Sequence, residues 1–105
     1  MKIKKHQMTV MICAILLSVT TGCATRSPDN HARNMAASCA ACHGTNGHSV
    51  GGAPVLAGAD RTYFITQMQN FKSGARPATI MNKHAKGYSD EEIAKLADFF
   101  AAQKP

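Results

Sequence analysis

The sequence lacks tryptophan and is poor in aromatic residues, with two tyrosines and four phenylalanines among 105 residues. Acidic residues are also scarce, six against twelve lysines and arginines. No apolar run reaches the roughly 20 residues that a membrane-spanning helix requires, and no segment shows the strict polar–apolar alternation of a β-strand. These features argue against a transmembrane protein and a β-rich fold. The short chain predicts one small domain and excludes a multidomain enzyme or a doubly wound α/β architecture.

The N-terminal segment has the pattern of an export signal. Lysines cluster in the first five residues, and an apolar run from Met8 to Val19 follows. This run is too short to span a membrane and fits the hydrophobic region of a signal peptide. Thr20–Thr21–Gly22–Cys23 resembles a bacterial lipobox, which predicts cleavage before Cys23 and a diacylglycerol on its sulfur. Cleavage after Ala24 is the alternative, and both predict an exported protein.

Processing at this site divides the chain into three parts. Residues 1–22 are the predicted signal peptide, 23–27 a tether and 28–105 the folded domain. Removing the signal takes away three lysines and no acidic residue, so the net charge falls from +6 to +3. That charge, made from interspersed basic and acidic groups, is too mixed for nucleic-acid binding. The predicted location is the periplasm, with membrane contact only through the lipid on Cys23.

A cofactor motif lies early in the domain. Cys39-Ala40-Ala41-Cys42-His43 is the C-x-x-C-H sequence of c-type haem attachment. The two thiols add across the two vinyl groups of one haem, and the adjacent histidine becomes the proximal iron ligand. A disulfide or a thioredoxin-like redox pair is the alternative, because exported thiols are readily oxidised. A redox pair would be expected in a βαβ context, which this sequence does not show. One covalent haem would also supply the apolar bulk that a small domain needs for stability.

Capping signals and apolar spacing predict three main helices around this cofactor. Ser27 as N-cap and Pro28 predict a first helix over 28–38 that leads into the haem motif. Residues 44–59 are rich in glycine and predict a loop. Asp60 and Gly74 bracket a second helix over 61–73. Residues 76–88 are predicted to be mostly irregular, with a helical turn near 81–85, and the capping box of residues 89–92 opens a last helix to about Gln103.

The sequence offers several candidates for the second axial ligand of the iron. Met68 lies on the apolar stripe of the second helix and is predicted to pack in the core. Met81 follows a proline between two helices and is the favoured ligand. His84, between two lysines, is predicted to face solvent, as are His31 and His48. A methionine ligand indicates electron transfer at high potential, a histidine a lower potential, and an open site ligand binding or catalysis.

The order of these features resembles class I c-type cytochromes over nearly all of the predicted domain. Within that class, CAACHGTNG at residues 39–47 and PVLAG at 54–58 are similar to the cytochrome c4 and flavocytochrome c group. Residues 63–76 are similar to its Gln-x-x-x-Phe-x-x-Gly-x-Arg stretch. The run TIM at 79–81, followed by AKGYSDEEI at 85–93, resembles the cytochrome subunit of flavocytochrome c sulfide dehydrogenase.

The resemblance implies a small all-α class I cytochrome c fold with one haem. It implies His43 and Met81 as axial ligands and a hydrogen bond from the His43 imidazole to the carbonyl of Pro54, which would orient the ring. Arg76 and Tyr88 are further candidates for contacts with the haem propionates. The implied partner is an FAD-containing flavoprotein that oxidises sulfide and passes electrons to the haem.

Three functions remain open from the sequence. The first is one-electron transfer, either as a sulfide dehydrogenase subunit or as a free-standing c4/c553-type carrier. The others are a haem enzyme, such as a peroxidase, and a gas sensor. Both require an iron with an open coordination site, which ligation by Met81 would close. Lysines and arginines near Met81 are candidates for docking an acidic redox partner; they are Lys72, Arg76, Lys83 and Lys86.

Overall fold

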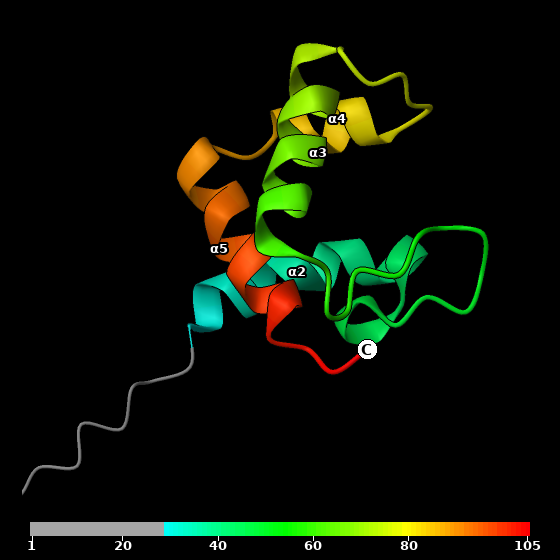
Figure 1. Ribbon diagram of the computed structural model, residues 1–105, viewed down its shortest axis with the longest axis vertical. Helices are drawn as coiled ribbons and strands as arrows, with labels where there is room; N and C mark the ends of the chain where they lie inside the picture. Colours follow the sequence, from blue (N-terminus) through cyan, green and yellow to red (C-terminus); the bar gives the residue numbers. More distant parts are fainter. Residues whose placement is uncertain (1–28) are drawn as a thin grey trace, which may run out of the picture.

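The computed structural model describes residues 29–105 and shows four α-helices and one short 3-10 helix (η1, Thr45–Gly47) in that range, with no strand among them. Figure 1 shows how the four α-helices are arranged relative to one another. This confirms the predicted all-α class. The predicted signal peptide, Cys23 and the tether lie outside the described residues. No helix within residues 29–105 is both long and apolar enough to cross a bilayer.

Helix α2 (Asn30–His43) begins later than predicted and extends further. Its N-cap is Asp29, whose side chain accepts hydrogen bonds from the backbone N–H groups of His31 and Ala32. The prediction of Ser27 as the cap was therefore wrong, because the carboxylate of Asp29 satisfies the free N–H groups of the first turn. The helix continues through the haem motif, which places both motif cysteines and His43 on regular helical backbone.

Helix α3 (Arg61–Ser73) has the bounds that the sequence predicted. Asp60 caps its start by accepting from the backbone N–H of Tyr63 at 2.8 Å. Gly74 ends it in the left-handed conformation, with φ of 84°. Glycine adopts this conformation without the steric cost that a side chain would add, so the chain stops and turns there.

Two further helices complete the described chain. The short α4 (Met81–Lys86) is the helical turn expected near 81–85. Helix α5 (Asp90–Ala101) begins with the predicted capping box, in which the Ser89 and Glu92 side chains each accept from the other's backbone N–H. It ends about two residues before the predicted boundary at Gln103.

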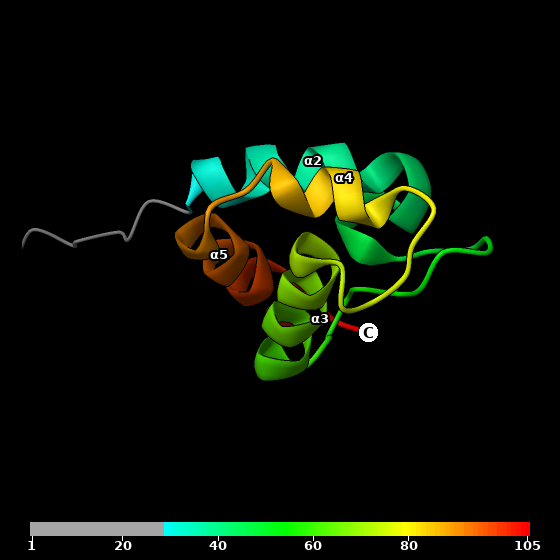
Figure 2. The same ribbon diagram turned by 90° about the horizontal axis from the view of Figure 1, so that it is seen from above.

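The core lies where α5 packs against α2 and α3. The apolar stripe of α5 is almost completely buried and consists of Ile93, Leu96, Ala97 and Phe100. Phe100 contacts Phe64 of α3, with 5.5 Å between ring centroids, and Phe99 edge-on at 5.2 Å. Figure 2 shows α5 and α3 on one side of α2 and the loop after α2 projecting away from the helices. Burying this stripe is the main stabilising contribution that the helices make to one another.

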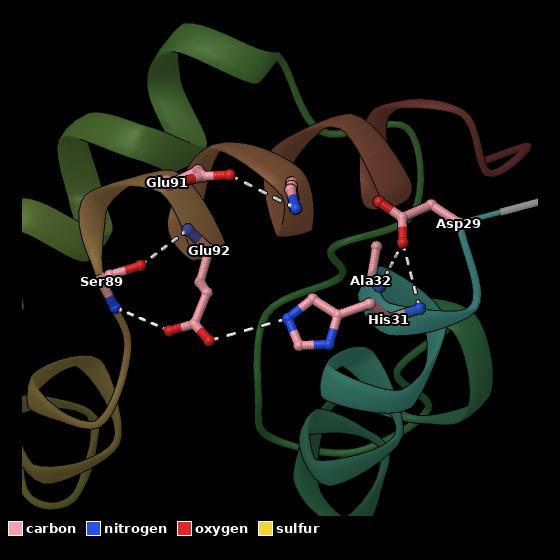
Figure 3. A network of polar contacts seen from close by, with 7 residues as sticks. Asp29, His31, Ala32, Ser89, Glu91 and Glu92 are labelled. Atoms are coloured by element: carbon pink, nitrogen blue, oxygen red, sulfur yellow. Dashed lines mark hydrogen bonds and ion pairs between the residues drawn. The ribbon is translucent and has the colours of Figure 1, made fainter.

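The N-terminal ends of α2 and α5 are also joined by polar contacts. Figure 3 shows the ring of His31 directed at the carboxylate of Glu92, with 3.7 Å between Nε2 and Oε1. The same carboxylate accepts the Ser89 backbone N–H. The capping box of α5 is therefore linked to the first turn of α2, the helix that carries the haem motif.

Candidate haem-binding site

The two motif cysteines lie in the last turns of α2. Their spacing of three residues puts them on the same face of the helix. Cys39 is half-buried against the core, whereas Cys42 is exposed, and both thiols are free rather than joined in a disulfide. Burial raises the pKa of the Cys39 thiol above its ordinary value, and a hydrogen bond with Ser38 partly offsets this. The half-buried Cys39 thus lies against the core, while Cys42 is open to solvent.

His43 is the last residue of α2 and the one polar side chain buried among the described residues. Its Nδ1 lies 2.7 Å from the carbonyl oxygen of Pro54. A carbonyl can only accept, so Nδ1 carries the proton and donates. In the neutral ring Nε2 then keeps its lone pair, which is the form that binds a metal.

The loop after α2 brings Pro54 to this position. Gly44 and Gly47 both have positive φ, near 80°, a backbone conformation that glycine adopts without steric cost. The Gly47 carbonyl then accepts from the backbone N–H groups of Leu56 at 2.9 Å and Ala57 at 3.2 Å. These two bonds return the segment after Pro54 to the end of α2, so the glycines that the sequence marked as a loop serve to orient His43.

Met81 is the first residue of α4. Its side chain is partly buried and packs against the same core cluster as Cys39. Of the other candidates, Met68 is buried in that cluster, 6% exposed, and is a packing residue as predicted. His84 is exposed, and so are His31 and His48.

The side chains considered for the propionates have partners within the protein. The Arg76 guanidinium donates to Gln67 at 2.6 Å and stacks over the Phe71 ring, 4.6 Å from its centroid. The Tyr88 hydroxyl lies 2.8 Å from the hydroxyl of Ser38. Both residues thus brace helices of the site.

Sequence reasoning missed Ser38 as a residue of the site. It precedes Cys39 in α2 and contacts Tyr88, which is 50 positions away in the chain. No local pattern marks such a pair, because a serine within a helix is commonly exposed and unremarkable. Only the folded arrangement of α2 against the junction of α4 and α5 reveals the contact.

The donor set fits a covalently attached haem. Two thiols share one helical face, and the next residue is a histidine whose tautomer is fixed with Nε2 free to bind iron. Met81, whose thioether sulfur is a possible iron ligand, packs against the core cluster that Cys39 also contacts. Sulfur and imidazole nitrogen are the protein ligands that c-type haem uses.

Comparisons with known proteins agree with this chemistry. The chain is 36% identical over 96 residues to the cytochrome subunit of sulfide dehydrogenase of Chlorobaculum tepidum, an alignment covering 82% of this chain and 87% of that protein. It is 34% identical to cytochrome c4 of Azotobacter vinelandii, covering 90% of this chain but only 50% of that protein. It is 39% identical over 72 residues to the thiosulfate dehydrogenase electron acceptor of Thiomonas intermedia, covering 67% of this chain and 33% of that protein.

The chain thus spans half or less of the length of the last two relatives. The model of the cytochrome c family matches residues 32–104 of this chain, which is nearly all of the described structure. Together with the helical fold, these findings establish what kind of protein it is. The chain belongs to the class I cytochrome c family, carries covalently bound haem c and functions in electron transfer.

Proposed function

We propose that this cytochrome is a periplasmic one-electron carrier with His43 and Met81 as axial ligands, and that it is the electron-accepting subunit of a sulfide dehydrogenase. The observation that carries the ligand assignment is the buried His43, oriented by Pro54. The position of Met81 against the cluster that also contacts Cys39 supports the second ligand.

Each of these residues has a distinct task. When bound, haem c supplies an iron that gains and loses one electron. Cys39 and Cys42 hold the group covalently to one helix. The Pro54 carbonyl accepts from Nδ1 of His43, which fixes the ring and increases the electron density on Nε2. Met81 offers a neutral thioether from α4, so the chain provides two ligands and no general base or nucleophile is required.

The narrower role rests on the relatives. The sulfide dehydrogenase cytochrome subunit from Chlorobaculum tepidum is matched over 87% of its length, so that relative is nearly the same size as this chain. Its name supports another sulfide dehydrogenase subunit as partner for this chain. The resemblance of residues 79–93 to that family implies that this partner is an FAD-containing flavoprotein. The alternative is a free-standing carrier of the c4/c553 type, which the similarity to cytochrome c4 and to a thiosulfate dehydrogenase electron acceptor supports. A peroxidase or gas sensor is disfavoured, because Met81 would have to leave the iron.

The cellular location belongs to the same proposal. The lysine-rich start, the apolar run of residues 8–19 and the lipobox-like residues 20–23 support export to the periplasm. Residues 1–22 are the proposed signal peptide, 23–27 the tether and 28–105 the cytochrome domain. A diacylglycerol on Cys23 would attach the domain to the membrane surface. Mass spectrometry of the mature N-terminus tests this, since an unmodified peptide starting at Thr25 would contradict lipidation.

Absorption spectroscopy of the purified holoprotein tests the axial ligands. We expect a sharp c-type α band in the reduced form and the methionine-to-iron charge-transfer band in the oxidised form. Met81→Ala should lose the charge-transfer band and bind carbon monoxide when reduced. Met81→His should lose the band but stay closed to carbon monoxide, because a second imidazole fills the site. Met68→Leu is the control and should keep the band. A band that survives in Met81→Ala would show that another residue is the ligand.

The sulfide dehydrogenase role has a separate test. The oxidised holoprotein is mixed with an FAD-containing sulfide dehydrogenase flavoprotein, and the haem α band is followed after sulfide is added. Reduction much faster with the flavoprotein than with sulfide alone supports the subunit role. Equal rates would favour the free-standing carrier.

A further inference from the structure

Tyr88 connects three helices at the junction between α4 and α5. Its backbone N–H donates to the carbonyl of Ala85 in α4 at 3.3 Å. Its carbonyl accepts from Nζ of Lys72 in α3 at 2.8 Å, and its hydroxyl lies 2.8 Å from the hydroxyl of Ser38 in α2. It directly precedes Ser89, the N-cap of α5. One residue therefore links the helix that carries the haem motif to the segment that carries Met81.

The direction of the bond between the two hydroxyls follows from its surroundings. The Ser38 hydroxyl donates its single proton to the carbonyl of Met35 at 2.8 Å. It can then only accept from Tyr88, so the tyrosine donates. In a regular α-helix the Met35 carbonyl is also the acceptor for the backbone N–H of Cys39. The chain of hydrogen bonds from Tyr88 thus ends at the carbonyl that holds the backbone of Cys39.

Packing also brings Tyr88 to the core cluster that Cys39 and Met81 contact. Tyr88, Cys39 and Met81 are all partly buried and all pack against it. Ala85, to which the Tyr88 backbone is bonded, is completely buried and belongs to the cluster. The apolar contacts hold α4 near α2, but they are not directional. The hydroxyl contact is directional and fixes the junction after α4 relative to the haem-bearing end of α2.

We propose that the Tyr88 hydroxyl is a positioning group that keeps the Met81 sulfur on the haem iron by bracing the α4–α5 junction against Ser38. This inference rests on the proposed ligation by Met81. A ligand side chain holds its metal best when its supporting contacts restrict its backbone, because less freedom must then be lost on binding. Without the hydroxyl, α4 keeps its fold but Met81 yields more easily to an external ligand.

Imidazole titration of the oxidised holoprotein tests the proposal. Imidazole competes with Met81, and the loss of the charge-transfer band measures the displacement. Tyr88→Phe removes only the hydroxyl, so we expect imidazole to bind about threefold more tightly, the factor for losing one partly solvated hydrogen bond. Ser38→Ala should give a similar change, and the double variant should add little to either single one. Tyr63→Phe is the matched control, because Tyr63 is an exposed tyrosine of α3, and it should bind imidazole as the wild type does.

Global unfolding by denaturant separates positioning from general stability. Alanine favours helix more than serine does, so Ser38→Ala should not unfold more easily, although Met81 should be displaced more easily. Unchanged imidazole affinity in both Tyr88→Phe and Ser38→Ala overturns the proposal. The proposal is also overturned if the effects of the two single variants on imidazole affinity add in the double variant, or if imidazole affinity simply follows the free energy of unfolding. A wild-type protein without the charge-transfer band would instead refute ligation by Met81, and with it both this inference and the proposed axial pair.

Discussion

Gly47 determines the path of the loop that carries Pro54 back to His43. It has φ of 82°, and its carbonyl accepts the backbone N–H groups of Leu56 and Ala57. A Cβ at this position would lie 2.7 Å from the Ala57 nitrogen and 2.8 Å from the Leu56 Cβ. Both the backbone conformation and the available space therefore require glycine.

Replacing Gly47 with alanine should destabilise the protein by about 3 kcal/mol, combining the left-handed backbone cost with the steric overlap. Denaturant unfolding of the holoprotein measures this. Gly51→Ala is the control, since a Cβ at Gly51 would meet no atom within 4 Å and the residue has no positive φ. Its effect should stay within about 0.5 kcal/mol. Similar losses in both variants would show that Gly47 has no special structural role.

Some of the candidate site could be anticipated residue by residue. The haem motif is a local signal, because its cysteines and histidine must follow one another in the chain. The contact between His43 and Pro54 spans 11 positions and was available only through the family resemblance. The contact between Ser38 and Tyr88 spans 50 positions and involves two common polar side chains. It depends on how α2 packs against the α4–α5 junction, which no local pattern encodes.

At the scale of the helices, the sequence predicted a helix end correctly where only one nearby residue could act as its cap. Asp60 and Gly74 define the two ends of α3, and the box at 89–92 defines the start of α5, because few residues can satisfy those backbone groups. Prediction failed at the start of α2, where a serine, a proline and an aspartate compete within three positions. Asp29 forms the cap there, since its carboxylate reaches two backbone N–H groups at once.

The capping box of α5 also predicts a pH dependence of stability. The backbone N–H of Ser89 donates to Glu92 and lowers the pKa of that carboxyl below its ordinary value, with a smaller contribution from His31. A carboxyl whose pKa is lowered on folding stabilises the protein above its unfolded pKa of about 4.3. This stabilisation is lost as the pH falls through the lower pKa of the folded state.

Glu92→Gln should therefore reduce the loss of stability between about pH 5 and pH 3, because glutamine can still accept from Ser89 but takes up no proton. Thermal unfolding of both proteins over pH 3–7 measures the slope. Glu91→Gln serves as control, since it removes a carboxylate from the same turn, and its contact with Lys95, without altering the capping box, and it should change the slope less than Glu92→Gln does. An unchanged slope in Glu92→Gln would contradict the linkage.

At the scale of the whole molecule, the basic residues near Met81 fall into two groups. Lys72 is paired with Asp90 at 3.1 Å and donates to the Tyr88 carbonyl, and Arg76 is held by Gln67 and Phe71. Both are thus engaged in structural contacts. Lys83 and Lys86 are exposed on α4, the helix that begins with Met81. The sequence indicated four candidate docking residues. Only the structure shows that two of them are held by other residues of the protein and that Lys83 and Lys86 are exposed.

Charge reversal on α4 tests whether this face guides electron transfer with the proposed flavoprotein partner. Lys83→Glu combined with Lys86→Glu should slow haem reduction about tenfold at low ionic strength, because two attractive charges become repulsive at the docking face. Raising the salt concentration should slow the wild type and narrow the difference, since exposed charges are screened within about 10 Å at 0.1 M. Lys95→Glu is the control, because Lys95 lies on α5 and pairs with Glu91 at 3.4 Å. Stopped-flow measurement of the α band gives the rates, and a rate independent of salt in the wild type would exclude steering by α4.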